Sequence, residues 1–590
     1  MKASRPLFAL ALLLAALTIP AVAQQAADTV APESRSAIEA KKPVHASRQM
    51  VAAANPVATQ AGLDVLRAGG SAADAVVAVQ TVLGLVEPQS SGLGGGAFMV
   101  WYDAKTGTVT TFDGRETAPA AATPELFLGA DGEPLDFFDA VIGGRSVGVP
   151  GVARLLETVH KKYGKRPWAE LMQPAIELAE GGFAISPRLN TMITEDIGRL
   201  DTQPETRAYF FDALGSPRAA GAVLRNPEYA ESLRAIAEGG ADAFYKGTLA
   251  GRIVAVVNGH PTNPGKLDLE DLAAYQVKER PAVCAPYRGL SVCGMGPPSS
   301  GALTIGQILG MVEPFDIATL GKDDPESWRI IGDATRLAFA DRERYMADSD
   351  VVKVPKGLLN ADYLKGRSAL IRRPTALPDD SVKPGEPPWD KAELDGAEFR
   401  IDGIAFDMPS TSHFTIVDAE GNVAAMTTSV ENAFGSRQMA GGFILNNQLT
   451  DFSFAPQKDG AAVANRVEPG KRPRSSMAPT IVLADGKPLY ALGSPGGSSI
   501  IPYVATTLIG LIDWKLDMQA AISMPHMLNR FGPFELEAGT KAEDFAGDLE
   551  ALGYKIKIGD QNSGLHGIAI TPGELTGGAD PRREGVALGD

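Results

Sequence analysis

The chain has 590 residues, of which 44% are hydrophobic, and a formal net charge of −16 at pH 7. This length and hydrophobic content suffice for a large buried core in one or more domains. The negative charge argues against nucleic-acid binding, because phosphates require a basic surface, and gives no support for binding to an anionic membrane.

The first 23 residues have the pattern of a signal peptide. A basic start precedes an apolar run from Leu7 to Ile19, and Ala21-Val22-Ala23 is a small-residue cleavage pattern. A membrane anchor is the alternative, but the polar sequence from Gln24 lacks a basic stop signal. No later stretch is long and uncharged enough to span a membrane. We therefore expect a periplasmic or secreted protein with no membrane segment in its mature form.

Helices and strands alternate from Met50 onwards, after a polar, alanine-rich leader over residues 24–45. The periodicity of residues 57–86 predicts two amphipathic helices separated at Gly69-Gly70. Residues 90–116 predict a glycine-rich turn followed by a hairpin, and residues 150–280 are rich in helical patterns.

The only two cysteines, Cys284 and Cys293, lie on either side of a predicted two-residue turn at Arg288-Gly289. This turn would place them opposite each other with Cα atoms ~4.5 Å apart, within disulfide range. Export favours oxidation, although two unpaired buried thiols are the alternative. The six histidines are scattered without metal-ligand spacing, so we expect no metal site.

Residues 372–409 are rich in Pro, Asp and Gly and have little periodicity, which indicates an exposed, protease-accessible linker. The linker ends at Ser410 and Thr411, where a β-hairpin is predicted to begin. If the chain is cut between these two residues, Thr411 becomes an N-terminus. Its α-amine could then act as the general base for its own hydroxyl group.

The turn of this hairpin is predicted at Ala419-Glu420-Gly421, with apolar residues alternating on both sides. Gly at the third loop position suits a type I turn closed by a bulge. A three-residue loop centred on Glu420 places Thr411 directly opposite Ser429, with Cβ atoms ~5 Å apart. The alternative is a plain edge strand that happens to begin with hydroxyl residues.

Gly496 and Gly497 lie between a predicted strand and an apolar helix. Their N–H groups would point outward near a helix N-terminus, which favours negative charge. A nucleotide phosphate loop is the competing interpretation, but the Gly-Lys-Ser/Thr ending is missing. A purely structural tight turn is the other alternative.

Three further segments contain groups that could bind a small zwitterion. Arg115 offers a bidentate fork for a carboxylate, and the adjacent hydroxyls of Ser475 and Ser476 could hold the same group. Acceptors for an ammonium group are Glu431, Gln448 and Asp451. For each segment taken alone, solvated or capping residues in an ordinary loop are the favoured alternative.

Taken together, these segments resemble the γ-glutamyltransferase family. The matching motifs are TSHFTIVD, NNQLTDF, KRPRSSMAPT and GSPGGSS, preceded by GGSAADAVVAV, EPQSSGLGGGAF and DGRETAP. The resemblance implies a four-layer αββα N-terminal-nucleophile hydrolase fold. It also implies a precursor that cuts itself into a large subunit, residues 24–410, and a small subunit, residues 411–590, which remain associated as a heterodimer.

The resemblance also implies a role for each candidate residue. Thr411 matches the nucleophile, and Ser410-Thr411 matches the scissile bond. Ser429 occupies the position of a second threonine; it keeps the hydroxyl group but lacks the methyl group. Gly496 and Gly497 match the oxyanion hole. The substrate α-carboxylate is assigned to Arg115, Ser475 and Ser476, and its α-amine to Glu431, Gln448 and Asp451.

The expected activity is that of an exported γ-glutamyltransferase and glutathione hydrolase without cofactor or metal. The γ-glutamyl group of glutathione or another γ-glutamyl compound would pass to water or to an amino acid or peptide acceptor. Residues 452–474, where many members carry a lid, are short and contain no Tyr or Trp, so a more open site is expected. Arg474 resembles the acylase branch, which removes dicarboxylic side chains from cephalosporins and is the alternative. An inert periplasmic binding protein with this fold is a further alternative.

Overall fold

The computed structural model describes residues 38–390, 400–401 and 410–590. The predicted signal peptide and most of residues 391–409 lie outside the described residues. In the described parts of the chain, no helix is both long enough and apolar enough to cross a membrane.

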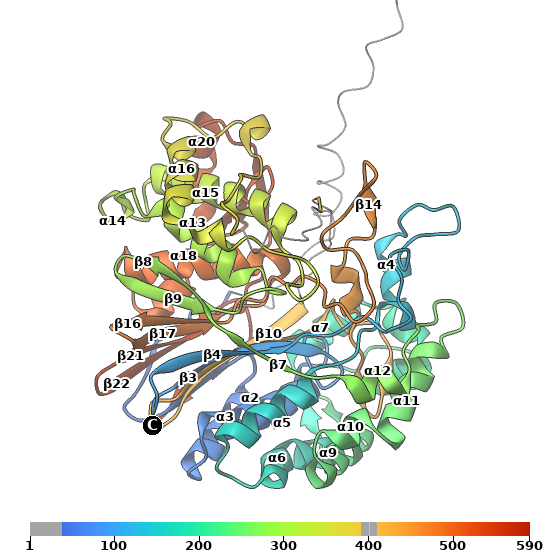
Figure 1. The fold of residues 1–590 in the computed structure, drawn as a ribbon. Coiled ribbons are helices and arrows are strands. Elements are labelled where there is room, and N and C mark those ends of the chain that lie inside the picture. The colour runs from blue at the N-terminus through green and yellow to red at the C-terminus, as the bar shows by residue number, and fades with distance from the viewer. Residues whose placement is uncertain (1–37, 391–399, 402–409) are drawn as a thin grey trace, which may run out of the picture.

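Two seven-stranded antiparallel sheets lie face to face at the centre of the molecule (Figure 1). The strands of the first sheet are, in spatial order, β1 (Val44–Ala46), β22 (Glu574–Ala579), β21 (His566–Thr571), β17 (Lys487–Gly493), β16 (Thr480–Ala484), β9 (Leu290–Gly294) and β8 (Val283–Tyr287). Those of the second sheet are β23 (Val586–Gly589), β2 (Met50–Ala53), β10 (Ser410–Val417), β11 (Val423–Glu431), β3 (Gly96–Asp103), β4 (Thr108–Gly114) and β7 (Lys278–Pro281).

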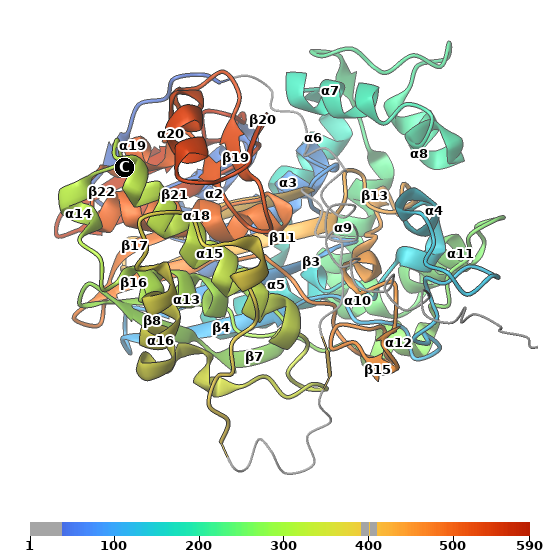
Figure 2. The ribbon, with the colours of Figure 1, turned by 90° about the horizontal axis from the view of Figure 1, so that it is seen from above.

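Helices cover the outer face of each sheet and complete the four-layer αββα arrangement that the family resemblance implied (Figure 1). The layer on the second sheet includes α2 (Pro56–Arg67), α3 (Ala72–Val86), α5 (Val152–Tyr163), α6 (Trp168–Gly181) and α9 (Pro227–Gly239). The layer on the first sheet includes α13 (Gly301–Val312), α15 (Pro325–Tyr345), α16 (Ala361–Ile371), α18 (Ile500–Ile512) and α20 (Ala546–Ala551). Seen from above, α13, α15 and α18 lie in front of the strands of the first sheet (Figure 2).

The core consists of apolar layers between the sheets and beneath each helical layer. Met50, Val100, Val417, Ile481 and Ile568 belong to the layer between the sheets. Both faces of the central strands are therefore covered, and every residue of β10 and β11 is buried. The polar residues at the start of β10 are consequently placed deep in the protein rather than on a solvated face.

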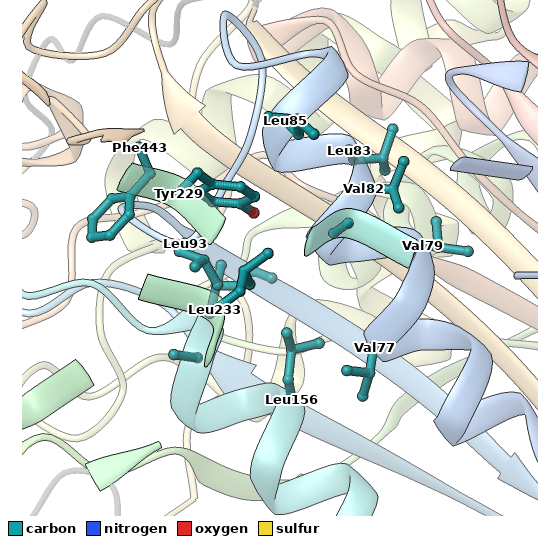
Figure 3. Close-up of a cluster of buried hydrophobic side chains, with 14 of the residues drawn as sticks. Val77, Val79, Val82, Leu83, Leu85, Leu93, Leu156, Tyr229, Leu233 and Phe443 are labelled. Atoms are coloured by element: carbon teal, nitrogen blue, oxygen red, sulfur yellow. The ribbon is translucent and has the colours of Figure 1, made fainter. Parts of the chain in front are cut away.

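Helix α3 differs from the prediction, because all fifteen of its residues are buried and it has no polar face. Val77, Val82 and Leu85 of this helix lie near Leu156 of α5 and Tyr229 of α9 (Figure 3). A helix that contacts neighbours on all sides is apolar all round and lacks the one-sided apolar stripe of an amphipathic helix. The predicted break is correct, since α2 and α3 end and begin on either side of Gly69-Gly70.

The two hairpins for which a register was predicted have the expected pairs. Strands β10 and β11 pair Thr411 with Ser429, and Gly421 in the turn has a φ of 87°. Strands β8 and β9 pair Cys284 with Cys293, and these form a disulfide with Cα atoms 4.0 Å apart. Both residues of the Arg288-Gly289 turn have positive φ, as a two-residue hairpin loop of this type requires.

The described part of the predicted linker, residues 372–390, is mostly exposed but is anchored to α15. Leu377 is buried, and its N–H donates to the Asp333 carboxylate at 3.0 Å. Arg336 donates to the Leu377 carbonyl at 2.7 Å. Further hydrogen bonds join Gly385 to Asp341 and Tyr345 of the same helix, so this part of the predicted linker is fixed to α15 although most of its residues are exposed.

Candidate active site

Thr411 and Ser429 lie on adjacent strands at the buried end of the β10–β11 hairpin. The Thr411 hydroxyl donates to the Ser429 hydroxyl at 3.2 Å, and the Ser429 hydroxyl donates to the carbonyl oxygen of Ser410 at 2.7 Å. The register shifts between Ser410 and Thr411, so the bond predicted to be cut lies at a β-bulge. A single hydroxyl group thus links the predicted nucleophile to the carbonyl group that it would attack.

The loop between α3 and β3 contacts β10, the strand that begins at the predicted cleavage site. The Ser410 hydroxyl donates to the Gln89 carbonyl at 2.6 Å, and the Ser412 hydroxyl donates to the Glu87 carboxylate at 3.1 Å. Burial raises the pKa of Glu87 to about 7. The motif that contains Glu87 and Gln89 was noted in the sequence, but neither residue was assigned a role.

Arg583 contacts the same strand from the C-terminal segment. Its Nη1 donates to the carbonyl oxygen of Thr411 at 3.0 Å, and its side chain is buried. Sequence reasoning missed this residue, because nothing in the spacing of the segment between β22 and β23 indicates a contact with Thr411.

A pocket opens over the Thr411 side chain. The residues that line it are Arg115, Thr411, Ser429, Glu431, Gln448, Asp451, Ser475, Ser476, Met477, Gly497 and Ile500. The structure therefore brings the predicted nucleophile, its partner and all six predicted substrate-binding residues to one place.

The charged residues of the pocket are already in contact with protein partners. Arg115 forms an ion pair with Asp451 and also donates to the carbonyl oxygens of Pro473 and Arg474 at 3.2 and 2.8 Å. Gln448 donates to the same Asp451 carboxylate at 2.7 Å. One guanidinium and two carboxylates, those of Glu431 and Asp451, line the pocket. A bound zwitterion could therefore replace the internal Arg115–Asp451 ion pair, with its negative group at Arg115 and its positive group at the two carboxylates.

Glu431 reaches the pocket through an unusual backbone conformation. It is the last residue of β11 and has a φ of 84°. Its N–H donates to the Ser429 hydroxyl at 2.8 Å, and its carboxylate accepts a hydrogen bond from the Asn447 amide. A non-glycine residue with positive φ is strained, and such strain is concentrated at functional sites.

The serine pair lies against α15 of the opposite helical layer. Arg342 donates to the Ser476 hydroxyl at 2.7 Å and to the Ser300 hydroxyl at 2.9 Å. Ser300 in turn donates to the carbonyl oxygen of Ser475 at 2.8 Å. Arg342 therefore orients the serine pair, and it was not identified from the sequence.

Gly496 and Gly497 form the turn between β17 and α18, as predicted. Their φ values of 137° and 56° are accessible mainly to glycine. Gly497 lines the pocket, whereas Gly496 is not among the lining residues. A short 3-10 turn, Gly497–Ser499, joins the glycines to α18.

The segment between Asp451 and Ser475 carries a small hairpin, β14 (Gln457–Lys458) and β15 (Ala461–Ala462), which projects from the molecule in Figure 1. One aromatic residue of this segment, Phe454, stacks on Phe127 with ring centroids 4.6 Å apart. That this segment leaves the site more open than in many relatives stays a prediction.

Comparison with known proteins gives consistent matches over most of the chain. A family model described as Gamma-glutamyltranspeptidase matches residues 58–590. The glutathione hydrolase proenzyme of Escherichia coli (strain K12) is 37% identical over 554 residues, which cover 92% of this chain and 91% of that protein. The acylase ACY 1 proenzyme of Pseudomonas sp. (strain SE83) is 35% identical and covers 93% of this chain and 94% of that protein. The crystal structure of cephalosporin acylase from Bacillus halodurans has a TM-score of 0.81 at 27% identity and covers 95% of this chain and 99% of that one.

Proposed function

The chain belongs to the gamma-glutamyltranspeptidase family, and on this basis we propose that it is an exported γ-glutamyltransferase and glutathione hydrolase that cuts itself before Thr411. The observation that carries the proposal is the shared pocket, in which Thr411 and Ser429 face the six predicted substrate-binding side chains. The chain was predicted from its sequence to have this activity, and its relatives include enzymes named glutathione hydrolase proenzyme.

Self-cleavage begins with attack of the Thr411 hydroxyl oxygen on the Ser410 carbonyl carbon. Ser429 accepts the hydroxyl proton of Thr411 and donates its own proton to the Ser410 carbonyl oxygen, along the two hydrogen bonds described above. As the bond between the Ser410 carbonyl carbon and the Thr411 nitrogen breaks, the new hydroxyl group of the intermediate loses its proton and becomes the ester carbonyl, and the Thr411 nitrogen takes up that proton. Water hydrolyses the resulting ester, which leaves Ser410 as a carboxylate and Thr411 as a free N-terminus.

In turnover, the Thr411 α-amine takes the proton of its hydroxyl group while the oxygen attacks the γ-glutamyl amide carbon. The N–H groups of Gly496 and Gly497 stabilise the oxyanion. The amide bond breaks, the leaving amine is protonated, and a γ-glutamyl ester remains on Thr411. Water then attacks this ester and releases glutamate. Alternatively, the amine of an amino acid or peptide attacks the ester and forms a new γ-glutamyl compound.

Substrate recognition follows from the charges of the pocket. The α-carboxylate of the glutamyl group would pair with Arg115, Ser475 and Ser476. Its α-ammonium group would pair with Asp451, Glu431 and Gln448. The zwitterion thereby replaces the Arg115–Asp451 ion pair charge for charge, and neither residue is left buried without a counterion.

The second candidate is a glutaryl side-chain acylase, which the names of two similar proteins favour. A glutaryl group supplies the carboxylate but no ammonium group. It would therefore separate Arg115 from Asp451 and leave two carboxylates, those of Glu431 and Asp451, without a new cation. This cost favours the γ-glutamyl substrate. Family membership and the intact hydroxyl pair favour either enzyme over an inert binding protein.

The test combines intact mass with two matched anilides. We expect the purified protein to contain a fragment that begins at Thr411 and ends at Asp590, and the variant Thr411→Ala to remain one uncut chain. The γ-glutamyl anilide should be hydrolysed faster than the glutaryl anilide, and Asp451→Ala should reduce this preference. Faster cleavage of the glutaryl anilide by the wild type would replace the transferase proposal with the acylase one.

A further inference from the structure

We propose that Arg530 is a positioning residue for the oxyanion loop, defined here as Gly496–Ser498. The inference rests on the proposed function, since it assumes that the N–H groups of Gly496 and Gly497 stabilise the oxyanion. Arg530 belongs to the connection between β18 (Met527–Leu528) and β19 (Phe534–Glu537), and it matches none of the motifs recognised in the sequence.

Arg530 contacts the loop directly. Its Nη1 donates a hydrogen bond to the hydroxyl oxygen of Ser498, which follows Gly497 in the chain. Arg530 is only 7% exposed and Ser498 only 6% exposed, so water has little access to this hydrogen bond. A charge-assisted hydrogen bond in such a position is stronger and more directional than one between neutral groups.

Other residues fix the guanidinium from its far side. Its Nη2 donates to the Glu535 carboxylate at 2.8 Å. The other oxygen of Glu535 accepts a hydrogen bond from the Gln561 side chain at 3.4 Å, and Gln561 accepts one from the Tyr503 hydroxyl at 2.8 Å. Since Glu535 balances the charge of Arg530, we assign Arg530 a geometric role rather than an electrostatic one.

The chain of contacts returns to the loop through Tyr503. A Cβ atom added to Gly496 would lie 2.7 Å from Cε2 of the Tyr503 ring, so the ring packs directly against this glycine. The loop is therefore fixed at both ends, at Gly496 by the Tyr503 ring and at Ser498 by Arg530. Both contacts belong to one hydrogen-bonded series of Arg530, Glu535, Gln561 and Tyr503.

The loop requires such support because of its composition. Two consecutive glycines with positive φ have no side chains to pack, and glycine has the greatest backbone freedom of any residue. Oxyanion stabilisation depends on donors placed about 2.7–3.1 Å from the charged oxygen. A small reorientation of the Gly497 peptide therefore weakens binding of the transition state more than binding of the amide substrate.

Self-cleavage provides an internal control for this role. The carbonyl oxygen of Ser410 accepts its hydrogen bond from Ser429, on the β10–β11 hairpin. Loss of the Arg530–Ser498 hydrogen bond should therefore impair turnover without slowing self-cleavage. General destabilisation of the protein would slow both.

The experiment compares Ser498→Ala, Arg530→Gln, Arg530→Lys and the double variant Ser498→Ala/Arg530→Gln with the wild type. Ser499→Ala is the matched control, since Ser499 lies next in the chain and makes no capping hydrogen bond at α18. For γ-glutamyl anilide hydrolysis, Ser498→Ala should lower kcat about tenfold, equivalent to about 1.4 kcal/mol, with KM nearly unchanged. Arg530→Lys should retain more activity than Arg530→Gln, and the double variant should be no worse than Arg530→Gln alone.

The key variant is Ser498→Ala, because it removes the contact while leaving the Arg530–Glu535 ion pair in place. A kcat equal to that of Ser499→Ala, or a parallel loss of self-cleavage, would overturn the positioning role. Strictly additive effects in the double variant would do the same. Failure of the proposed function gives a different result, in which the wild type itself does not hydrolyse the γ-glutamyl anilide.

Discussion

At the scale of single residues, Ser429 is the group on which the proposed self-cleavage depends most. Its hydroxyl accepts from Thr411 and donates to the Ser410 carbonyl, so one oxygen atom serves two steps of the proposed reaction. The family resemblance places a threonine at this position. The extra methyl group is not needed for either hydrogen bond.

We therefore predict that Ser429→Ala slows self-cleavage at least tenfold, because the carbonyl loses a hydrogen-bond donor and the nucleophile loses an acceptor. Ser429→Thr should cleave at close to the wild-type rate. The measurement is the time course of fragment appearance on a denaturing gel. Cleavage of Ser429→Ala at the wild-type rate would show that the proton does not pass through this hydroxyl group.

Glu116 provides a prediction about pH, because it is fully buried next to Arg115. Neither of its carboxylate oxygens accepts a hydrogen bond from the described residues, and the nearest guanidinium nitrogen of Arg115 is 3.9 Å away. Burial raises the pKa of Glu116 to about 8 from an ordinary value of 4.5. The folded protein thus binds a proton there that the unfolded chain releases at lower pH.

The stability contributed by this proton is fully present below pH 4.5 and is lost as the pH rises through about 8. Glu116→Gln cannot titrate, so its melting temperature relative to that of the wild type should rise between pH 5 and about pH 8 and level off above that. Thermal unfolding at several pH values measures this difference. The exposed control Glu133→Gln should show no such trend, and a pH-independent difference for Glu116→Gln would contradict the assignment.

At the scale of elements, the β8–β9 hairpin lies at the edge of the first sheet and contributes no residue to the pocket. The Cys284–Cys293 disulfide closes a loop with a sequence separation of 9. So short a loop restricts the unfolded chain only modestly, which limits the stabilisation to about 3 kcal/mol or less.

We predict that Cys284→Ser/Cys293→Ser lowers the free energy of unfolding by no more than this amount and leaves kcat and KM unchanged. Denaturant unfolding and anilide hydrolysis measure the two quantities. Thiol labelling of the unfolded, unreduced wild type should detect no free cysteine. Two labelled thiols, or a loss of activity in the double variant, would refute the prediction.

The elements show which features a single sequence can predict. Both hairpin registers are local, since a turn of known length fixes every pair along the two strands, and both are confirmed. Contacts between distant segments are not encoded in any period. Arg342 is 134 residues from Ser476, Arg583 is 172 residues from Thr411, and Glu87 is 325 residues from Ser412. These residues were missed because only the folded layers bring them to the site.

At the scale of the whole molecule, both sheets combine strands from either side of Thr411. In the second sheet, β10 lies between β2 and β11, and β11 lies between β10 and β3. In the first sheet, β16 pairs with β9, and β22 pairs with β1. The predicted large and small subunits therefore do not form separate domains, because each sheet contains strands of both.

This arrangement predicts that cleavage before Thr411 does not release either fragment. Separation would expose the edges of β2, β3 and β9 and the apolar layer between the sheets. The free-energy cost of exposing so much apolar surface far exceeds the entropy that the chain gains when one peptide bond is cut. The cleaved protein should elute from a sizing column at the volume of the uncut Thr411→Ala variant, yet show two bands on a denaturing gel. An affinity tag on Asp590 should recover both fragments in 1 M salt, because the shared surface is largely apolar and hydrogen-bonded, and ion pairs that cross it, such as Arg437–Asp196 and Arg472–Asp113, are buried and therefore little screened by salt. Recovery of the tagged fragment alone under native conditions would show that the two fragments are independent folding units.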